Sequence, residues 1–381
     1  MNPVNIDDMR DLARRRLPRA VFDFLDGGAL DELTLHANRA DFERIFFRPR
    51  VLVDVSKRTL ATRIFGVEHK LPIVLGPIGS LGLLARRGEM LVAQAAEKFG
   101  VPMCLSTASV CSIEEVKGAT TRPFWFQLYV GREREVAQEL MERAASANCP
   151  VLVFTVDQAV SSRRERDARN GLTFPMRITP YNILNMLINI RWIWDVLLGP
   201  PLDLGNYRKP GERSRNVLTF PQRAAKTQDP SKTWKEVDWV RSIWKGPLVI
   251  KGLLTPEEAR RAIEHGADGI VVSNHGGVIL DGDPSTISVL PAIADAVGGK
   301  TKIFLDGGIR RGQDVLKAIS LGADACFVGR AYAYGLAAAG EAGVLRSLQI
   351  LESEMSATMA LLGRNHVSEL DRTALMPTNP P

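Results

Sequence analysis

Residues 302–330 read KIFLDGGIRRGQDVLKAISLGADACFVGR and contain one unit of the repeat that decides the fold. A short apolar run, Lys302 to Asp306, ends in paired glycines, and a helix-forming stretch leads to a second apolar run, Ala325 to Gly329. Apolar runs this short and this continuous are typical of strands buried on both faces of a parallel sheet. The segment therefore predicts a strand, a crossover helix and a second parallel strand.

The same pattern recurs along the chain. Residues 262–268 (AIxxGAD) are echoed at 318–324, an offset of 56 residues that equals two strand–helix units. The stretch Thr255-Pro256-Glu257-Glu258 indicates a helix start, and that helix is expected to close at Gly266. Eight strands that alternate with helices predict an α/β fold, a (β/α)8 TIM barrel, with a doubly wound open sheet as the alternative. The six further apolar runs expected to be strands are Leu71 to Gly76, Pro102 to Ser106, Phe124 to Tyr129, Val151 to Val156, Leu248 to Lys251 and Gly269 to Ser273.

Two segments lie outside the repeat. Residues 1–50 predict an N-terminal helical extension, and residues 161–237 form a long insertion after the fourth strand. We expect 1–381 to be a single domain, because barrels accommodate such insertions. The insertion follows a strand at the C-terminal mouth of the barrel, where barrels carry their chemistry.

The composition excludes several classes of protein. With 45% hydrophobic and 24% charged residues, the 381-residue chain is not a disordered, collagen-like or polytopic membrane protein. Its net charge is +6, but basic and acidic residues interleave without an aromatic–basic motif, so we expect no nucleic-acid partner. The four cysteines are scattered, which favours free thiols in a reducing compartment. No export signal opens the chain, and we expect a cytoplasmic location.

Polar residues follow the carboxyl ends of the expected strands. Those ends converge on one pocket in a barrel, although a strand-terminal hydroxyl on its own usually just satisfies backbone groups. These residues are Ser106, Gln127, Tyr129, Thr155, Asp157, Lys251, Ser273, His275, Asp306 and Arg330.

Two glycine loops indicate an anion site. Residues 306–312 (DGGIRRG) and 328–330 (VGR) each precede a helix-forming run, and Arg310 and Arg330 add positive charge. Glycines let the backbone approach an anion, and helix N-termini present unpaired N–H groups to it. Barrels often bind phosphate after strands seven and eight, which are the strands concerned here. Turn glycines with solvated arginines are the alternative.

His275 stands apart from the other four histidines, because it lies at a strand end in the glycine-rich turn Ser273-Asn274-His275-Gly276-Gly277. It is a candidate base, and Asp157 at the end of the fourth strand is a candidate carboxylate to orient it. No second His or Cys stands at ligand spacing, so we expect no metal.

Together these motifs resemble the FMN-dependent α-hydroxy acid dehydrogenase and oxidase family, in order from about Asp7 to Leu362. The branch of bacterial L-lactate dehydrogenases looks most similar, through residues 109–115 (SVCSIEE) and 194–196 (WDV), with mandelate dehydrogenase next. The motifs that carry the resemblance are Gly76-Pro77-Ile78-Gly79, Leu105-Ser106-Thr107, Phe126-Gln127-Leu128-Tyr129, Phe154-Thr155-Val156-Asp157, Val249-Ile250-Lys251-Gly252, Ser273-Asn274-His275-Gly276-Gly277, Asp306-Gly307-Gly308 and Gly329-Arg330.

The resemblance implies bound FMN and an enzyme that oxidises the CH–OH group of a 2-hydroxy acid by hydride transfer, with His275 as the base and Asp157 and Tyr129 in support. A quinone, a cytochrome or O2 would take the electrons, and the assembly would be a homotetramer. The residues implied for FMN are Pro77, Ile78, Gly79, Ser106, Gln127, Thr155, Lys251 and Ser273 for the ring, Asp306 for the ribitol, and Gly307, Gly308, Arg310, Gly329 and Arg330 around the phosphate.

Two positions depart from the family pattern. Val278 stands where members carry an arginine that clamps the substrate carboxylate, and Phe24 replaces a tyrosine that hydrogen-bonds it. Arg164 matches a second arginine near that carboxylate, and Tyr129 and His275 complete the expected substrate set. Either Arg164 suffices for an ordinary hydroxy acid, or the substrate is atypical, such as a larger hydroxy acid or a neutral hydroxy ester, amide or amine.

The insertion contains an apolar stretch, Tyr181 to Leu198, followed by a basic run that ends at Lys226. The stretch is slightly too short to cross a bilayer and carries charges, but it suits an anionic membrane surface, here the inner face of the cell membrane. A lid over the flavin or a subunit contact is the alternative.

Two other functions compete with a flavoenzyme. One is a non-redox phosphosugar isomerase or aldolase with Lys251 as a Schiff base, and the other is a catalytically silent flavin-binding or membrane scaffold. Flavin colour separates the first from a flavoprotein, and anaerobic bleaching by substrate separates the second from an enzyme.

Overall fold

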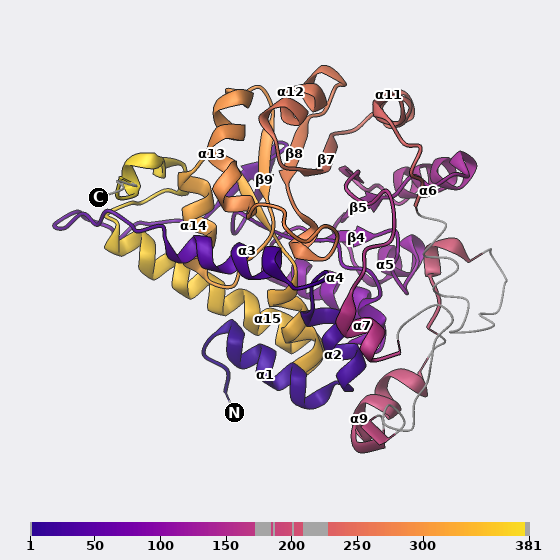
Figure 1. Cartoon of the computed structure of the whole chain (residues 1–381). Helices are drawn as coiled ribbons and strands as arrows, with labels where there is room; N and C mark the ends of the chain where they lie inside the picture. The colour runs from indigo at the N-terminus through magenta and orange to yellow at the C-terminus, as the bar shows by residue number, and fades with distance from the viewer. Residues whose placement is uncertain (1, 172–183, 186, 200–201, 209–227, 378–381) are drawn as a thin grey trace.

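The computed structural model describes residues 2–171, 184–185, 187–199, 202–208 and 228–377 (Figure 1). Eight parallel strands form one sheet in the order β3-β10-β9-β8-β7-β6-β5-β4. The Leu75 N–H donates to the Pro102 carbonyl at 2.9 Å beside a bridge between Leu75 and Met103, which closes the sheet between β3 and β4. The predicted TIM barrel is thereby confirmed. Its strands are β3 (Ile73–Leu75), β4 (Cys104–Ser106), β5 (Trp125–Leu128), β6 (Leu152–Thr155), β7 (Leu248–Leu253), β8 (Gly269–Val272), β9 (Lys302–Leu305) and β10 (Ala325–Val328).

Helices alternate with these strands and cover the outside of the barrel (Figure 1). The helix expected at Thr255 begins at Pro256, with the Thr255 side chain accepting from the Glu258 N–H, and it ends at Glu264 just before Gly266. The helices that follow the barrel strands are α4 (Gly88–Phe99), α5 (Ile113–Ala119), α6 (Arg134–Ser146), α11 (Trp234–Ile243), α12 (Pro256–Glu264), α13 (Thr286–Val297), α14 (Gly312–Ser320) and α15 (Arg330–Leu361).

A short hairpin that the sequence analysis did not predict fills the end of the barrel opposite the C-terminal mouth. Strands β1 (Thr62–Ile64) and β2 (Val67–His69) pair antiparallel, and Phe65 at their turn lies 5.9 Å from Trp125 and 6.0 Å from Phe304, ring centre to ring centre. Each strand has only three residues and little burial, so the hairpin carries no apolar run that would reveal it. The aromatic contacts stabilise the barrel core.

The N-terminal extension consists of α1 (Ile6–Arg16), α2 (Arg19–Asp26) and α3 (Leu33–Glu43), and α1 lies along α15 (Figure 1). Buried Asp26 joins it to the rest of the chain, because it accepts from Arg10, from the Tyr334 hydroxyl at 2.7 Å and from Arg166 at 3.0 Å. These partners overcome the effect of burial and lower the Asp26 pKa, so the carboxylate stays charged. The network fixes the end of α2 at the barrel mouth.

The insertion between β6 and β7 contains α7 (Glu165–Arg169) and α9 (Ile190–Trp192), followed by a π-helical turn, Ile193–Leu197. The Trp192 indole N–H donates to the Leu83 carbonyl at 2.7 Å, which fixes this part of the insertion to the barrel. Among the described residues, no helix combines the length and the apolar character needed to cross a membrane.

Candidate active site

A cavity of about 360 Å³ lies at the carboxyl ends of the barrel strands. Most of the residues predicted for the site line it, which places side chains from the N-terminal extension, the barrel loops and the insertion around one space. These are Phe24, Pro77, Ile78, Gly79, Ser106, Tyr129, Arg164, Lys251, His275, Val278, Asp306, Gly307, Gly308, Arg310, Gly329 and Arg330. Of the other four predicted residues, Gln127, Asp157 and Ser273 contact lining residues, and Thr155 accepts a hydrogen bond from Gln127.

His275 is held between a carboxylate and a phenol. Its Nδ1 lies 3.0 Å from one Asp157 oxygen and 3.1 Å from the other, and its Nε2 lies 3.4 Å from the Tyr129 hydroxyl. Burial opposes ionisation of Asp157, but the contact with His275 outweighs it and lowers the Asp157 pKa. An ionised Asp157 fixes the proton on Nδ1 and leaves Nε2 toward Tyr129 as the nitrogen that can accept a proton.

The backbone after β8 makes this placement possible. His275, Gly276 and Gly277 have φ values of 55°, 66° and 77°, so three consecutive residues lie in the left-handed region. A Cβ on Gly277 would lie 2.6 Å from the Leu35 nitrogen. Glycine is therefore required for α3 to pack against this turn.

Behind the cavity floor, a chain of buried hydrogen bonds fixes Gln127. Its amide nitrogen donates to the Thr155 hydroxyl at 3.0 Å, and its amide oxygen accepts from the Ser106 hydroxyl at 3.2 Å. Each group is fixed by its neighbour, so the amide presents one defined orientation.

Lys251 provides a buried cation at the cavity wall. Its ammonium lies 3.0 Å from Asp306 and donates to the Ser273 hydroxyl at 2.8 Å. Burial favours the neutral amine, but Asp306 and Asp157 outweigh that effect and raise the Lys251 pKa. Lys251 is therefore a stable positive charge. This state does not suit a Schiff-base lysine, which must lose its proton.

The two glycine loops fit a phosphate and its ribityl chain. Asp306 Oδ1 is buried without a hydrogen-bond partner, and Arg330 is buried beside Arg310 and Arg164. Burial lowers the Arg330 pKa to about 10, and repulsion by the other two guanidinium groups adds to the effect. An unpaired acceptor together with clustered buried cations suits hydroxyl groups and a phosphate. The residues present therefore fit FMN.

Arg330 also has a role that the sequence reading missed. Its guanidinium donates to the carbonyls of Leu25, Gly27 and Gly276 at 2.9, 2.7 and 2.8 Å. These contacts join the end of α2 to the His275 turn. No motif reveals them, because the acceptors are backbone groups.

Several other lining residues were not predicted. Gln158 brings a polar group to the mouth from just after β6, and Ser162 and Gln228 do so from the insertion; their only signal was that they follow β6. Leu25, Leu84, Ile279 and Phe327 add apolar wall.

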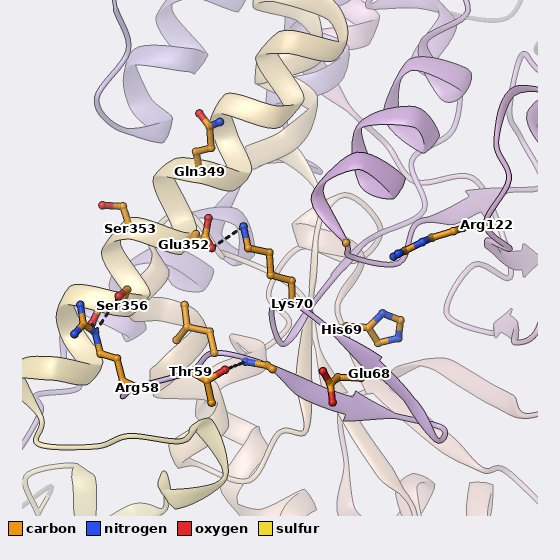
Figure 2. Close-up of a pocket in the computed structure, with 13 residues that line it drawn as sticks. Arg58, Thr59, Glu68, His69, Lys70, Arg122, Gln349, Glu352, Ser353 and Ser356 are labelled. Carbon is orange, nitrogen blue, oxygen red and sulfur yellow. Dashed lines mark hydrogen bonds and ion pairs between the residues drawn. The ribbon is translucent and has the colours of Figure 1, made fainter. Parts of the chain in front are cut away.

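A larger hollow of about 700 Å³ lies at the opposite end of the barrel, between α15 and the segment around β2 (Figure 2). None of the predicted site residues lines it. Figure 2 shows Lys70 paired with Glu352, at 2.8 Å, and Arg58 bonded to Ser356. Some of its charged side chains are already paired or hydrogen-bonded within the chain. Barrels carry their chemistry at the opposite end, the C-terminal mouth.

Comparisons with known proteins agree with this geometry. The L-lactate dehydrogenase of Caulobacter vibrioides (strain NA1000 / CB15N) is 47% identical over 369 residues, which cover 97% of this chain and 96% of that protein. That of Yersinia pestis (strain Pestoides F) is also 47% identical, over 97% of both chains.

Solved structures are similar over the same length. The monotopic membrane protein (S)-mandelate dehydrogenase is 38% identical and superimposes with a TM-score of 0.94 over 99% of this chain and 100% of that one. A soluble mutant of the membrane-associated enzyme from Pseudomonas putida, 38% identical, gives a TM-score of 0.84 over 98% of this chain and 99% of that one. The profile of the FMN-dependent dehydrogenase family matches residues 13–377. The chain belongs to this family of FMN-dependent enzymes.

Proposed function

We propose that His275 is the base with which this FMN-dependent enzyme oxidises the CH–OH group of a 2-hydroxy acid or a derivative. The observation that carries the proposal is the contact between His275 and ionised Asp157 at the cavity wall. Asp157 orients the imidazole and stabilises the cation that forms when Nε2 takes the hydroxyl proton. Tyr129, whose pKa is raised by burial, stays protonated and donates to the substrate oxygen.

The remaining residues would hold FMN, which when bound supplies the two-electron acceptor. Pro77 to Gly79, Ser106, Gln127 and Thr155 surround the ring, with Ser273 supporting Lys251. Asp306 accepts from ribityl hydroxyls, and Gly307, Gly308, Gly329, Arg310 and Arg330 enclose the phosphate. A fixed Lys251 cation stabilises negative charge that develops beside it.

Flavin colour and bleaching test this function. The purified protein should be yellow, and a 2-hydroxy acid or its derivative should bleach the flavin without oxygen. A folded, colourless protein would favour the non-redox barrel. A yellow protein that no such compound bleaches would favour a silent scaffold.

The substrate is proposed to be atypical, because Phe24 and Val278 both line the cavity and neither binds an anion. L-lactate should therefore give a kcat/KM below about 10⁴ M⁻¹s⁻¹, the lower end for enzymes on their own substrates. The double variant Phe24→Tyr with Val278→Arg should raise this value. Efficient oxidation of L-lactate by the unmodified enzyme would show that Arg164 is sufficient.

We further propose that a quinone, a cytochrome or O2 takes the electrons and that 1–381 acts as one domain in a homotetramer, as the family resemblance implies. The location would be cytoplasmic, peripheral on the inner face of the cell membrane.

The insertion supports this membrane proposal. Trp192 is buried against the barrel, whereas Trp194 is exposed. The exposed apolar side chains, each 59% to 72% exposed, are Leu184, Leu187, Ile188, Ile190, Trp194 and Leu198. None of the described residues in 184–199 lines the cavity, which argues against the lid. Most of the basic run, 209–227, lies outside the described residues.

Flotation with anionic vesicles tests membrane binding. The protein should float at low salt and less at high salt, because apolar burial and attraction to lipid headgroups act together. The variant Leu187→Glu with Trp194→Glu should lose flotation, whereas Leu361→Glu, at another exposed leucine, should keep it. Equal recovery in the soluble fraction with and without vesicles would leave the subunit contact as the explanation.

A further inference from the structure

We infer that the preferred substrate is an uncharged amide or ester of a 2-hydroxy acid, whose apolar substituent extends over a rim of leucine and valine side chains at the cavity mouth. This inference rests on the proposed function and names its substrate class. It follows from the charge balance of the cavity and from the surface around it.

Most of the positively charged side chains that line the cavity already have a partner or a proposed role. Lys251 pairs with Asp306, and Arg310 and Arg330 belong to the glycine loops that fit the phosphate. Among the described lining residues, Arg164 is then the basic side chain that remains for a substrate carboxylate.

Arg164 already contacts other groups of the chain, although burial outweighs them and lowers its pKa, and its Nε is buried without a hydrogen-bond partner. Its Nε lies 3.3 Å from Asp167 Oδ2, and one terminal nitrogen donates to the Phe24 carbonyl at 2.7 Å and more weakly to that of Gly27 at 3.4 Å. The guanidinium carbon also lies 5.2 Å from the centre of the Phe24 ring. A carboxylate beside Arg164 would have to compete with Asp167 for the same charge.

The apolar side chains that line the cavity supply no second positive charge. Val278 and Ile279 follow the His275 turn and line the cavity with Phe24 and Leu25. A carboxylate buried against such a wall without its own counter-charge is strongly disfavoured, whereas a neutral carbonyl carries a far smaller desolvation cost. The cavity therefore favours the amide or ester over the free acid.

Exposed aliphatic side chains belong to the segments that line the cavity mouth. Leu280 follows the lining residue Ile279, and Val160 lies between the lining residues Gln158 and Ser162. Leu30 joins the two segments, because its N–H donates to the Arg163 carbonyl at 3.0 Å and the neighbouring Ala29 N–H donates to the Gly277 carbonyl. These three aliphatic side chains are 44% to 60% exposed.

Contiguous exposed apolar surface marks interaction sites or ligand-binding grooves. Leu30, Val160 and Leu280 lie on segments that also line the cavity or bond to it, which favours the distal part of the substrate itself as the occupant. We call Leu30, Val160 and Leu280 the aliphatic rim.

The reaction on such a substrate balances as for a free hydroxy acid. The carbinol C–H bond would break with its electron pair passing as hydride to the FMN that the cavity residues would hold, and the hydroxyl proton would pass to His275. The carbinol carbon becomes a ketone, the amide or ester bond is untouched, and the two electrons leave to the external acceptor.

Matched substrates test both parts on the purified holoenzyme. We compare mandelate, mandelamide and N-benzylmandelamide by anaerobic flavin bleaching, and we measure binding from the change in flavin absorbance with a non-reducing pair, benzoylformate and its amide. Mandelamide should exceed mandelate at least about 10-fold in kcat/KM, and the benzyl group should add a further several-fold gain. The amide of benzoylformate should likewise bind more tightly than the acid.

Variants separate the two contributions. Val278→Arg should reverse the preference toward mandelate, whereas Val278→Leu, which keeps the wall apolar, should retain it; flavin content checks that both fold. Leu280→Ser should remove most of the gain from the benzyl group, and Leu361→Ser, at an exposed leucine at the end of α15, should keep that gain.

Two results would overturn the inference while the proposed function stands: a preference of the unmodified enzyme for mandelate, or a benzyl gain that Leu280→Ser does not change. Bleaching by none of the three compounds, nor by lactate, would overturn the proposed function together with this inference.

Discussion

Replacing His275 with alanine is expected to slow reduction of the bound flavin at least about 100-fold and to leave the flavin in place. The side chain touches the cavity through Nε2 and is oriented by Asp157 at 3.0 Å, so its loss removes the proton acceptor. The FMN phosphate is proposed to lie at Arg310 and Arg330, so cofactor content should not fall. Stopped-flow absorbance under anaerobic conditions measures the rate.

Asp157→Asn is the matched control for this experiment. The amide keeps the size of the side chain but loses the charge that stabilises a protonated imidazole, so the loss of rate should be smaller than that in His275→Ala. Because the Asp157 pKa is lowered, its carboxylate stays ionised down to acidic pH, so its contact with His275 persists there. A reduction rate near wild type in His275→Ala would remove this residue from the mechanism.

Removing Arg310 and Arg330 together should weaken FMN binding by roughly 10²- to 10⁴-fold, because each charge-assisted contact contributes about 1.5 to 3 kcal/mol. Arg310→Ala on its own isolates the phosphate contribution, since Arg330 also donates to the carbonyls of Leu25, Gly27 and Gly276. Flavin content after gel filtration and titration of the apoprotein with FMN measure the effect.

The neighbouring arginine provides the control. Arg311 pairs with Glu354 at 2.8 Å and does not line the cavity, so Arg311→Ala removes the same charge from the same loop without touching the proposed phosphate site. It should keep its flavin. Full flavin occupancy in the Arg310 and Arg330 double variant would contradict the phosphate assignment.

The sequence by itself determined the barrel, and it named most of the residues that were then found to line the cavity. Each strand is a short apolar run and each glycine loop is a contiguous motif, so hydrophobic periodicity and turn chemistry act within a few residues. The strand ends then had to converge, because parallel strands in a barrel share one carboxyl end. For the same reason, the hairpin of β1 and β2 was missed, since its three-residue strands have little local signal.

Only the tertiary structure decided which partner each charged side chain contacts. Asp157 meets His275 across 118 residues of sequence, and Arg164 reaches the Phe24 carbonyl across 140. From the sequence alone, Arg164 was a cation available to a substrate carboxylate. The structure places Asp167 next to its guanidinium and the Phe24 ring of α2 against it. Charge compensation depends on distances of a few ångströms between side chains, and those distances are set by how distant segments pack and not by local pattern.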